Sequence, residues 1–231
     1  MANIILIDTS TEVCSVALSN NGKIVWEKVS DESMNHSVLL AKYIQELTEE
    51  MRQQGIQADA VAVSCGPGSY TGLRIGVSTA KGLCFGAGIP LLAVNTLQVM
   101  SQGYLNRHGA VADDTWMCPM IDARRMEVYT AFYDNSLSLQ REISADIIDS
   151  ESYSDILDSH KIICFGNGSS KCKDTLTHPN VSFVDGITPL AADMAKLAEA
   201  AYEKKEFQDV AYFEPFYLKE FVATVSKNKL M

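Results

Sequence analysis

The 231-residue sequence lacks the features that define several large classes of protein. No apolar run reaches the ~20 residues that a membrane-spanning helix requires. The 6 cysteines are widely spaced and include no Cys-x-x-Cys pair, so the sequence predicts neither a disulfide framework nor a local zinc site. The N-terminus has no basic flank and no cleavable apolar segment. Together with buried, reduced thiols, this favours a cytoplasmic protein.

Positive charge and histidine are also scarce. The chain has 19 lysines and arginines against 29 acidic residues, a formal net charge of −10 at pH 7. Because this balance provides no basic field to gather phosphates, we do not expect the chain alone to hold nucleic acid tightly. None of the 4 histidines lies three or four residues from another, the spacing of metal ligands on a helix. With no Gly-x-Ser-x-Gly nucleophile turn either, the sequence favours a binding protein over a catalyst and predicts no metal site.

What the sequence does contain is a regular alternation of apolar strands and helices. The first half predicts three strands, then helix, strand, helix, strand and helix, with Gly55 ending the first helix. The predicted strands are Asn3–Asp8, Val13–Leu18, Lys23–Val29, Val61–Cys65 and Leu91–Val94. The predicted helices are residues 36–54, residues 72–87 and one that begins at Thr96.

The second half repeats two motifs of the first in the same order. Ile7-Asp8, followed by Glu12-Val13, recurs as Ile121-Asp122 followed by Glu127-Val128. Gly66-x-Gly68-Ser69 recurs as Gly166-x-Gly168-Ser169, again before an expected helix; a helix at Ala191–Tyr202 and an extended segment at Phe213–Leu218 follow. The repeat predicts an α/β fold of two similar subdomains, residues 1–106 and 107–231, each built as βββαβα. This layout resembles the actin-like ATPases, in which ATP lies in the cleft between the halves.

The residues that would hold a nucleotide depart from that pattern. The first turn reads Asp8-Thr9-Ser10-Thr11 and has no glycine to let backbone amides approach a phosphate. Asp8 and Asp122 could hold Mg²⁺ in the cleft, or they could bond to their own turns. The segment Gly66–Gly72 resembles a phosphate cradle but lacks the lysine of a P-loop, so a tight turn is the alternative. Arg124-Arg125 is either a phosphate contact or a surface pair.

The first two predicted helices carry more apolar and small residues than one buried stripe needs. Val38, Leu39 and Tyr43 widen the apolar arc of the first helix. In the second, Gly72, Gly76 and Ala80 recur every fourth residue, as do Gly82 and Gly86. Glycine costs ~1 kcal/mol relative to alanine inside a helix, so a close approach should compensate. That approach is either internal or to another protein.

These motifs resemble the bacterial TsaB (YeaZ) family over essentially the full length. The most specific segments are Ile7–Thr11, His36-Ser37-x-x-Leu40 and Gly66–Gly76, with support from Asp122–Tyr129 and Tyr217-Leu218. The resemblance implies a subunit of the machinery that makes N6-threonylcarbamoyladenosine at position 37 of tRNA. It implies a non-catalytic partner of the catalytic paralogue TsaD, joined by the ATPase TsaE, with tRNA reached indirectly and a homodimer when isolated.

The resemblance also implies which residues act. Thr96 and Met100 stand where the catalytic paralogue has its two metal-ligating histidines, so no catalytic residue, metal or cofactor is expected here. The partner surface is expected on the first two helices, at Leu40, Tyr43, Ile44, Leu47, Leu73, Gly76, Val77, Ala80 and Lys81. A vestigial nucleotide cleft is expected at Asp8, Thr9, Ser10, Thr11 and Asp122. The alternative is a nucleotide-binding actin-like kinase or ATPase with modified phosphate turns.

Overall fold

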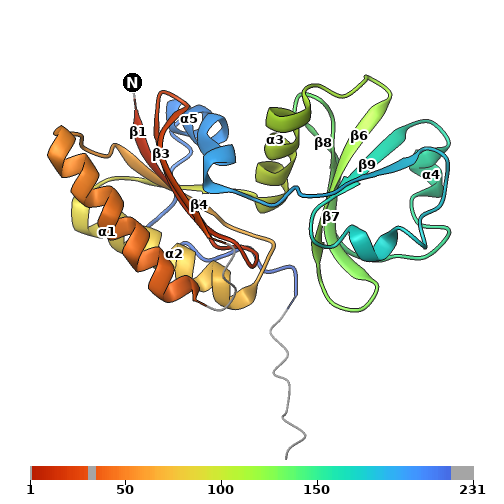
Figure 1. The fold of residues 1–231 in the computed structure, drawn as a ribbon, viewed down its shortest axis with the longest axis horizontal. Coiled ribbons are helices and arrows are strands. Elements are labelled where there is room, and N and C mark those ends of the chain that lie inside the picture. Colours follow the sequence, from red (N-terminus) through yellow and green to blue (C-terminus); the bar gives the residue numbers. More distant parts are fainter. Residues whose placement is uncertain (1, 31–34, 220–231) are drawn as a thin grey trace, which may run out of the picture.

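A computed structural model describes residues 2–30 and 35–219, which form two lobes, each built on a five-stranded sheet (Figure 1). The first sheet has the order β3-β2-β1-β4-β5 and the second the order β10-β9-β6-β7-β8. The strands of the first are β1 Asn3–Asp8, β2 Cys14–Asn20, β3 Lys23–Ser30, β4 Ala60–Ser64 and β5 Leu91–Val94. Those of the second are β6 Thr115–Asp122, β7 Glu127–Tyr133, β8 Leu139–Ile147, β9 Lys161–Phe165 and β10 Val181–Val184.

The two sheets have the same topology. In the first, β1 pairs antiparallel with β2 and parallel with β4. In the second, β6 pairs antiparallel with β7 and parallel with β9. The duplicated actin-like α/β architecture predicted from the repeated motifs is therefore confirmed. The predicted bounds of β1 and β5 agree with the structure because β1 is an apolar run that ends at Asn3 and Asp8, and β5 is an apolar run between Pro90 and Asn95.

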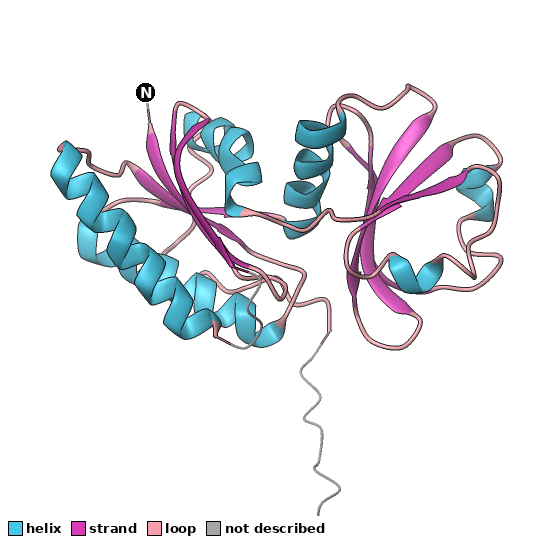
Figure 2. Cartoon of the chain, in the orientation of Figure 1, coloured by secondary structure: helices cyan, strands magenta, loops and turns pink. Residues whose placement is uncertain are grey.

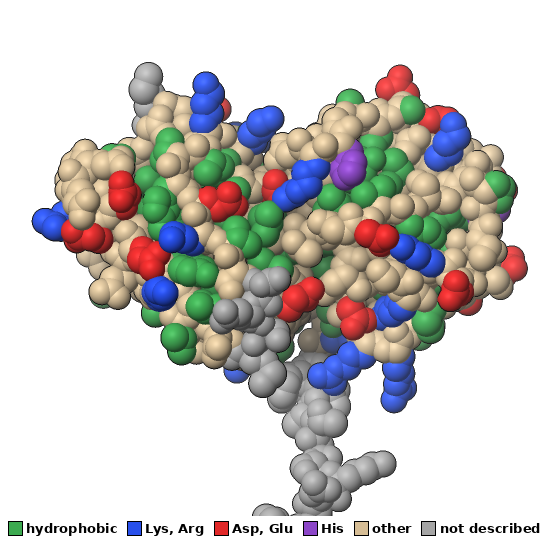
Figure 3. All heavy atoms as spheres, viewed as in Figure 1, with side chains coloured by type: hydrophobic (Ala, Val, Ile, Leu, Met, Phe, Trp, Pro, Cys, Tyr) green, Lys and Arg blue, Asp and Glu red, His purple; other side chains and the backbone are tan. Residues whose placement is uncertain are grey.

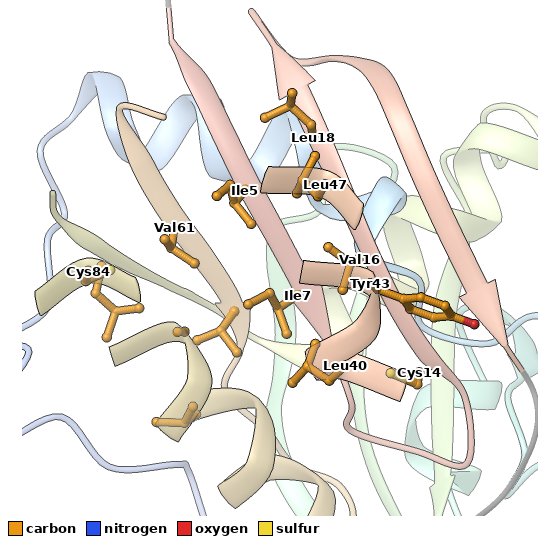
Figure 4. Close-up of a cluster of buried hydrophobic side chains, with 14 of the residues drawn as sticks. Ile5, Ile7, Cys14, Val16, Leu18, Leu40, Tyr43, Leu47, Val61 and Cys84 are labelled. Carbon is orange, nitrogen blue, oxygen red and sulfur yellow. The ribbon is translucent and has the colours of Figure 1, made fainter. Parts of the chain in front are cut away.

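Two long helices lie side by side over one face of the first sheet (Figure 2). They are α1 His36–Gln54 and α2 Tyr70–Ala87. Gly55 ends α1 in the left-handed conformation at φ 67°, as predicted. The Ser69 side chain caps α2 by accepting the Gly72 N–H at 3.2 Å, so this helix begins before the predicted residue 72. Leu40, Tyr43 and Leu47 point from α1 onto the sheet (Figure 4).

The other face of each sheet is covered by a helix from the opposite half of the chain. Helix α3, Thr96–His108, packs on the second sheet through Leu97, Met100 and Tyr104. The 3₁₀ turn η2, Ala191–Met194, and helix α5, Ala195–Glu203, pack on the first sheet. Strands β1–β5 precede residue 106 and strands β6–β10 follow it, so a division there separates the two sheets. Helix α3 and the η2–α5 segment, however, each pack on the sheet of the other half, and we call them the exchanged helices.

Within the described residues, the outer face of the second lobe carries no long helix. The helix expected after Gly168 is only the 3₁₀ turn η1, Ser170–Cys172, and helix α4 spans Ser154–Leu157. The reason is chain length, because residues 166–180 connect β9 to β10 whereas residues 65–90 connect β4 to β5. The predicted helix at Ala191–Tyr202 is confirmed, although its first turn is 3₁₀.

The segment after α5 crosses the first lobe without forming a regular strand. Gln208 makes an isolated bridge to Leu91 of β5, and the Phe216 N–H donates to the Cys65 carbonyl at 2.7 Å. The predicted extended segment Phe213–Leu218 is therefore held by contacts with α2 and β4 rather than by a sheet. All 6 cysteines are free, and all but the half-buried Cys65 are buried. Among the described residues, no helix has the length and apolar character needed to span a membrane.

Candidate functional site

A cleft with a volume of about 870 Å³ lies between the lobes. Six segments line it: the β1–β2 turn, the start of α1, the start of α2, the β6–β7 turn, Asn167 after β9, and the chain at residues 216–219. Most of the lining side chains carry hydroxyl, amide or aromatic groups, with Glu12 and Asp122 as the carboxylates. The cleft is the position at which the fold brings both halves of the sequence repeat together.

Asp8 ends β1 beneath the cleft and is fully buried. Its carboxylate accepts the Ser10 N–H at 3.1 Å and the Ser10 hydroxyl at 3.0 Å, and it also accepts the Ser64 hydroxyl from β4. Burial raises the pKa of this carboxyl from 3.8 to about 6. Asp8 thus bonds to its own turn and to the neighbouring strand, and it does not line the cleft.

Thr9 packs tightly against the start of α2. Its hydroxyl donates to the Gly72 carbonyl at 2.7 Å. A Cβ at Gly72 would lie 2.0 Å from the Thr9 carbonyl oxygen, and one at Gly76 would lie 2.4 Å from the Thr9 Oγ1. The close approach of the β1–β2 turn therefore explains why these two helix positions are glycine. Ser10 and Thr11, the next residues of that turn, line the cleft.

Asp122 occupies the matching position in the second lobe, but it is exposed. Its carboxylate accepts the Arg124 N–H at 3.1 Å and forms an ion pair with Lys171. Its own N–H donates to the Asn167 Oδ1 at 3.0 Å. The Asn167 Nδ2 donates in turn to Glu12 of the first lobe at 2.9 Å. A chain of hydrogen bonds therefore crosses the cleft from one hairpin turn to the other.

Thr96 and Met100, the two residues expected at the histidine positions of the paralogue, both take part in internal packing. Thr96 begins α3, and its hydroxyl accepts the Gly66 N–H at 3.2 Å. Met100 is fully buried, and its Cε would lie 2.4 Å from a Cβ placed at Gly166. Within residues 2–30 and 35–219, no group of three or more histidine, cysteine and acidic side chains is arranged to hold a metal ion.

Most residues expected at the partner surface lie inside the chain's own fold. Seven are buried against the first sheet or the β1–β2 turn: Leu40, Tyr43, Leu47, Leu73, Gly76, Val77 and Ala80. Lys81 is half-buried, and its amine donates to the carbonyls of Ala211 and Phe213 at 3.1 and 2.9 Å. Ile44 is half-buried as well. The apolar stripe of a helix normally faces the core of its own domain, so the fold itself explains why these positions are apolar.

The sequence reasoning did not single out the outer surface where α1 and α2 meet. One flank of α1 is fixed by the ion pair between Glu46 and Lys28 of β3, and one flank of α2 by Lys81. The two remaining flanks face each other, and helical spacing assigns to them a set of uncharged side chains. We call this set the helix seam: Ala41, Ile44, Thr48, Thr79, Gly82, Leu83 and Gly86.

The glycines of the helix seam differ from those beside Thr9. A Cβ at Gly82 or Gly86 would meet nothing within 4 Å. Beside the seam, the side chains of Phe85 on α2 and Val38 on α1 are 85% and 65% exposed. The recurrence of glycine at positions 82 and 86 was the available signal, but the spacing alone did not show which glycines faced outward.

The comparisons with known proteins agree with this architecture. The sequence model of the family described as TsaD, tRNA N6-adenosine threonylcarbamoyltransferase, matches residues 23–230. The tRNA threonylcarbamoyladenosine biosynthesis protein TsaB of Escherichia coli K12 is 32% identical over 229 residues, 95% of this chain and 96% of the relative. TsaB of Haemophilus influenzae is 29% identical and covers 94% of this chain and 93% of the relative.

A solved structure of YeaZ from Pseudomonas aeruginosa superimposes with a TM-score of 0.80 at 26% identity, covering 94% of this chain and all of that one. A second Pseudomonas aeruginosa structure, described as similar to peptidase YEAZ, gives a TM-score of 0.81. The resemblance predicted from the motifs is thereby confirmed. The chain belongs to the TsaB (YeaZ) family of tRNA threonylcarbamoyladenosine biosynthesis proteins.

Proposed function

We propose that the chain is the non-catalytic subunit of the complex that installs N6-threonylcarbamoyladenosine in tRNA, and that it binds a TsaD-like catalytic paralogue through the helix seam. Membership of the TsaB family supports the pathway. The observation that carries the surface is the pair of outward-facing glycines, Gly82 and Gly86, in an uncharged strip between two long helices.

Glycine is costly inside a helix. Each glycine within α2 destabilises the helix by ~1 kcal/mol relative to alanine. Gly72 and Gly76 are required because the Thr9 backbone and side chain leave no room for a Cβ. Gly82 and Gly86 have open space and no such internal reason. A partner helix packed along the seam supplies one, since small residues let two helices approach closely.

Exposed apolar side chains beside the seam add to this argument. Phe85 presents almost its whole ring to solvent, and Val38 is largely exposed on α1. Exposed apolar patches mark sites of interaction between proteins, and aromatic side chains are enriched at such interfaces. A second copy of the chain presents the same surface, so we expect the isolated protein to form a homodimer that the paralogue replaces.

The remaining parts of the proposal follow from the family. A TsaE-like ATPase joins the assembled pair, the tRNA is held chiefly by the paralogue, and the assembly works in the cytoplasm. The transfer chemistry belongs to the paralogue. In this chain Thr96 and Met100 are engaged in internal packing at the positions where that chemistry would need imidazoles.

The rival proposal, a nucleotide-binding kinase or ATPase, has less support. Asp8 bonds to Ser10 and Ser64, and the Thr9 hydroxyl is used by Gly72. The rival requires Mg²⁺ and ATP to bind in the cleft with an affinity that Asp8→Ala abolishes. Titration calorimetry of the wild type and this variant with ATP and Mg²⁺ separates the two proposals.

The test of the seam uses arginine in place of an outward glycine. Gly82 and Gly86 are exposed, and a Cβ at either meets nothing within 4 Å. Gly82→Arg and Gly86→Arg also gain helix propensity, so both variants should melt at or above the wild-type temperature. Both should fail to co-purify with the TsaD-like paralogue. The control is Ala200→Arg on α5, an exposed position on the helix that covers the opposite face of the same sheet. Association that survives in both seam variants would contradict the proposal.

A further inference from the structure

The β6–β7 turn holds two consecutive arginines in the left-handed backbone conformation. Arg124 has a φ of 73° and Arg125 a φ of 51°. This region is unfavourable for side chains other than glycine, asparagine and aspartate. The turn is fixed by three hydrogen bonds: Arg124 N–H to Asp122 Oδ1 at 3.1 Å, Ala123 N–H to the Glu127 carbonyl at 3.0 Å, and Glu127 N–H to the Arg124 carbonyl at 3.1 Å. The fold thus keeps two arginines where other residues would be more stable.

Arg124 and Arg125 are both exposed. Across the described ranges, neither Arg124 nor Arg125 forms an ion pair or a side-chain hydrogen bond. The nearby cations are already paired, Lys171 with Asp122 and Lys219 with Glu127. Figure 3 shows basic side chains projecting at the lower edge of the second lobe. In a chain of net charge −10, the turn is a local excess of positive charge at the rim of the cleft.

We propose that Arg124 and Arg125 bind successive phosphates of an RNA backbone. The choice of RNA rests on the proposed function in tRNA modification. A guanidinium presents a planar set of donors that matches phosphate oxygens, and its charge persists at every working pH. The contact is direct, so this proposal departs from the expectation that the chain reaches tRNA only through the paralogue.

The position of the two arginines favours the binding of a polyanion along the rim of the cleft, rather than the binding of a nucleotide inside it. Arg124 lines the cleft, whereas Arg125, the next residue, does not. Inside, the carboxylates of Glu12 and Asp122 would repel a bound phosphate. A backbone running along the edge meets both cations and avoids those carboxylates.

Two phosphate contacts give a weak interaction alone. This agrees with the acidic balance of the chain, which predicts little affinity for nucleic acid without a partner. In the assembled complex the two arginines add to contacts made by the paralogue. Because both subunits belong to one complex, the effective concentration of the arginines near the bound tRNA is high. The site therefore acts as an accessory contact that orients the tRNA.

The test combines a gain of stability with a loss of binding. In the double variant Arg124→Asn/Arg125→Gly, both new residues tolerate the left-handed conformation, so the melting temperature should rise by roughly 2–4 °C. The affinity of the complex for an unmodified tRNA transcript should fall roughly tenfold at 0.1 M salt, and the slope of log K against log salt should shrink by about 1.4–1.8. The control is Lys161→Gln/Lys173→Gln, which removes two cations of the same lobe that are paired with Asp114 and Asp185.

The outcomes separate this proposal from the one on the helix seam. Lower tRNA affinity with a smaller salt slope, and with unchanged co-purification of the paralogue, supports the arginine contact. Unchanged affinity and slope in the arginine variant, or an equal loss in the lysine control, overturns it. If the wild-type chain does not associate with the paralogue at all, the seam proposal fails. The same salt titration on the chain alone, at low salt, then decides the arginine contact by the same criterion.

Discussion

The two lobes share one strand order but differ in what covers their sheets. The first carries the long helices α1 and α2 on its outer face, and the second carries the short α4 and η1. The difference lies in the length of the connections, not in the sheets. Duplication has therefore preserved the framework, while one lobe has kept a broad helical surface. That lobe is where we propose partner binding, and the other supplies the polar and basic rim of the cleft.

The two lobes are alike in how the backbone of their glycine turns packs. Gly66 and Gly166 both have positive φ, 117° and 105°. A Cβ at Gly68 would lie 2.3 Å from the Ser10 carbonyl oxygen, and one at Gly168 would lie 2.8 Å from the Ile121 carbonyl carbon. In each lobe the glycine turn packs on the first hairpin of the same sheet. The repeated Gly-x-Gly motif is thus explained by packing in both halves, without any phosphate.

The largest effect should come from comparing glycines within α2. Gly72→Ala puts a Cβ 2.0 Å from the Thr9 carbonyl oxygen and should lower the free energy of unfolding by about 3 kcal/mol, the upper end for overpacking. Gly82→Ala, in open space, should raise it by about 0.5–1 kcal/mol. Urea unfolding of both variants measures the difference. Equal effects of the two changes would remove the distinction between internal and outward glycines.

Asp8 should make stability depend on pH. Because burial favours its protonated form in the folded chain, the stabilisation is complete below pH 3.8 and is lost as the pH rises through about 6. The loss should be at most about 3 kcal/mol, because each tenfold difference in proton affinity between the folded and unfolded chain is worth about 1.4 kcal/mol. Asp8→Asn cannot titrate, so its stability relative to the wild type should increase from pH 4 to pH 7. If the free energies of unfolding of the wild type and of Asp8→Asn, measured in urea, changed equally with pH, the Asp8 carboxyl would not be buried as described.

The exchanged helices should be held together by Asp193 of η2. Its carboxylate accepts Arg107 Nη1 at 2.9 Å and Asn106 Nδ2 at 3.0 Å, both from α3. The Asp193 side chain is 8% exposed and that of Arg107 34%. Because Arg107 is partly solvated, Asp193→Ala should cost about 2 kcal/mol, less than the loss of a fully buried pair. Lys161→Ala, which removes an exposed ion pair of the second lobe, is the control and should change unfolding by less than about 1 kcal/mol.

The smallest effect should come from the contact across the cleft. Asn167→Ala removes the hydrogen bond to Glu12 at 2.9 Å and the one from the Asp122 N–H at 3.0 Å, both of which are exposed to solvent. Such bonds contribute about 0.5–1.5 kcal/mol, and exposure places these two at the low end. Thermal unfolding should therefore shift by at most a few degrees. A loss as large as that of Asp193→Ala would mean that the lobes are joined at the mouth of the cleft as much as at the exchanged helices.

Much of the fold could be predicted because it depends on local pattern. Apolar runs such as Leu91–Val94, the glycine cap at Gly55 and the repeated hairpin motifs are all visible over a few residues. The prediction of a helix after Gly168 was wrong because connection length, not the local motif, decides whether a helix fits there.

The candidate site was less predictable because it depends on contacts between distant segments. Periodicity showed that Leu40 and Leu47 belong to an apolar face, but not that this face is the one turned to the core. The bond between Asn167 and Glu12 joins residues of different lobes. The anchoring of the chain at Ala211 and Phe213 by Lys81 is of the same kind. No local pattern specifies such contacts.

Hydrogen exchange can show whether the helix seam of the first lobe is the partner surface. Amide exchange is measured on the wild-type chain alone and with a saturating amount of the TsaD-like paralogue. The seam account predicts slower exchange in α1 and α2, around residues 41–48 and 79–86, and little change in β8 and α4 of the second lobe. Protection confined to the second lobe, with α1 and α2 exchanging as in the free chain, would contradict it.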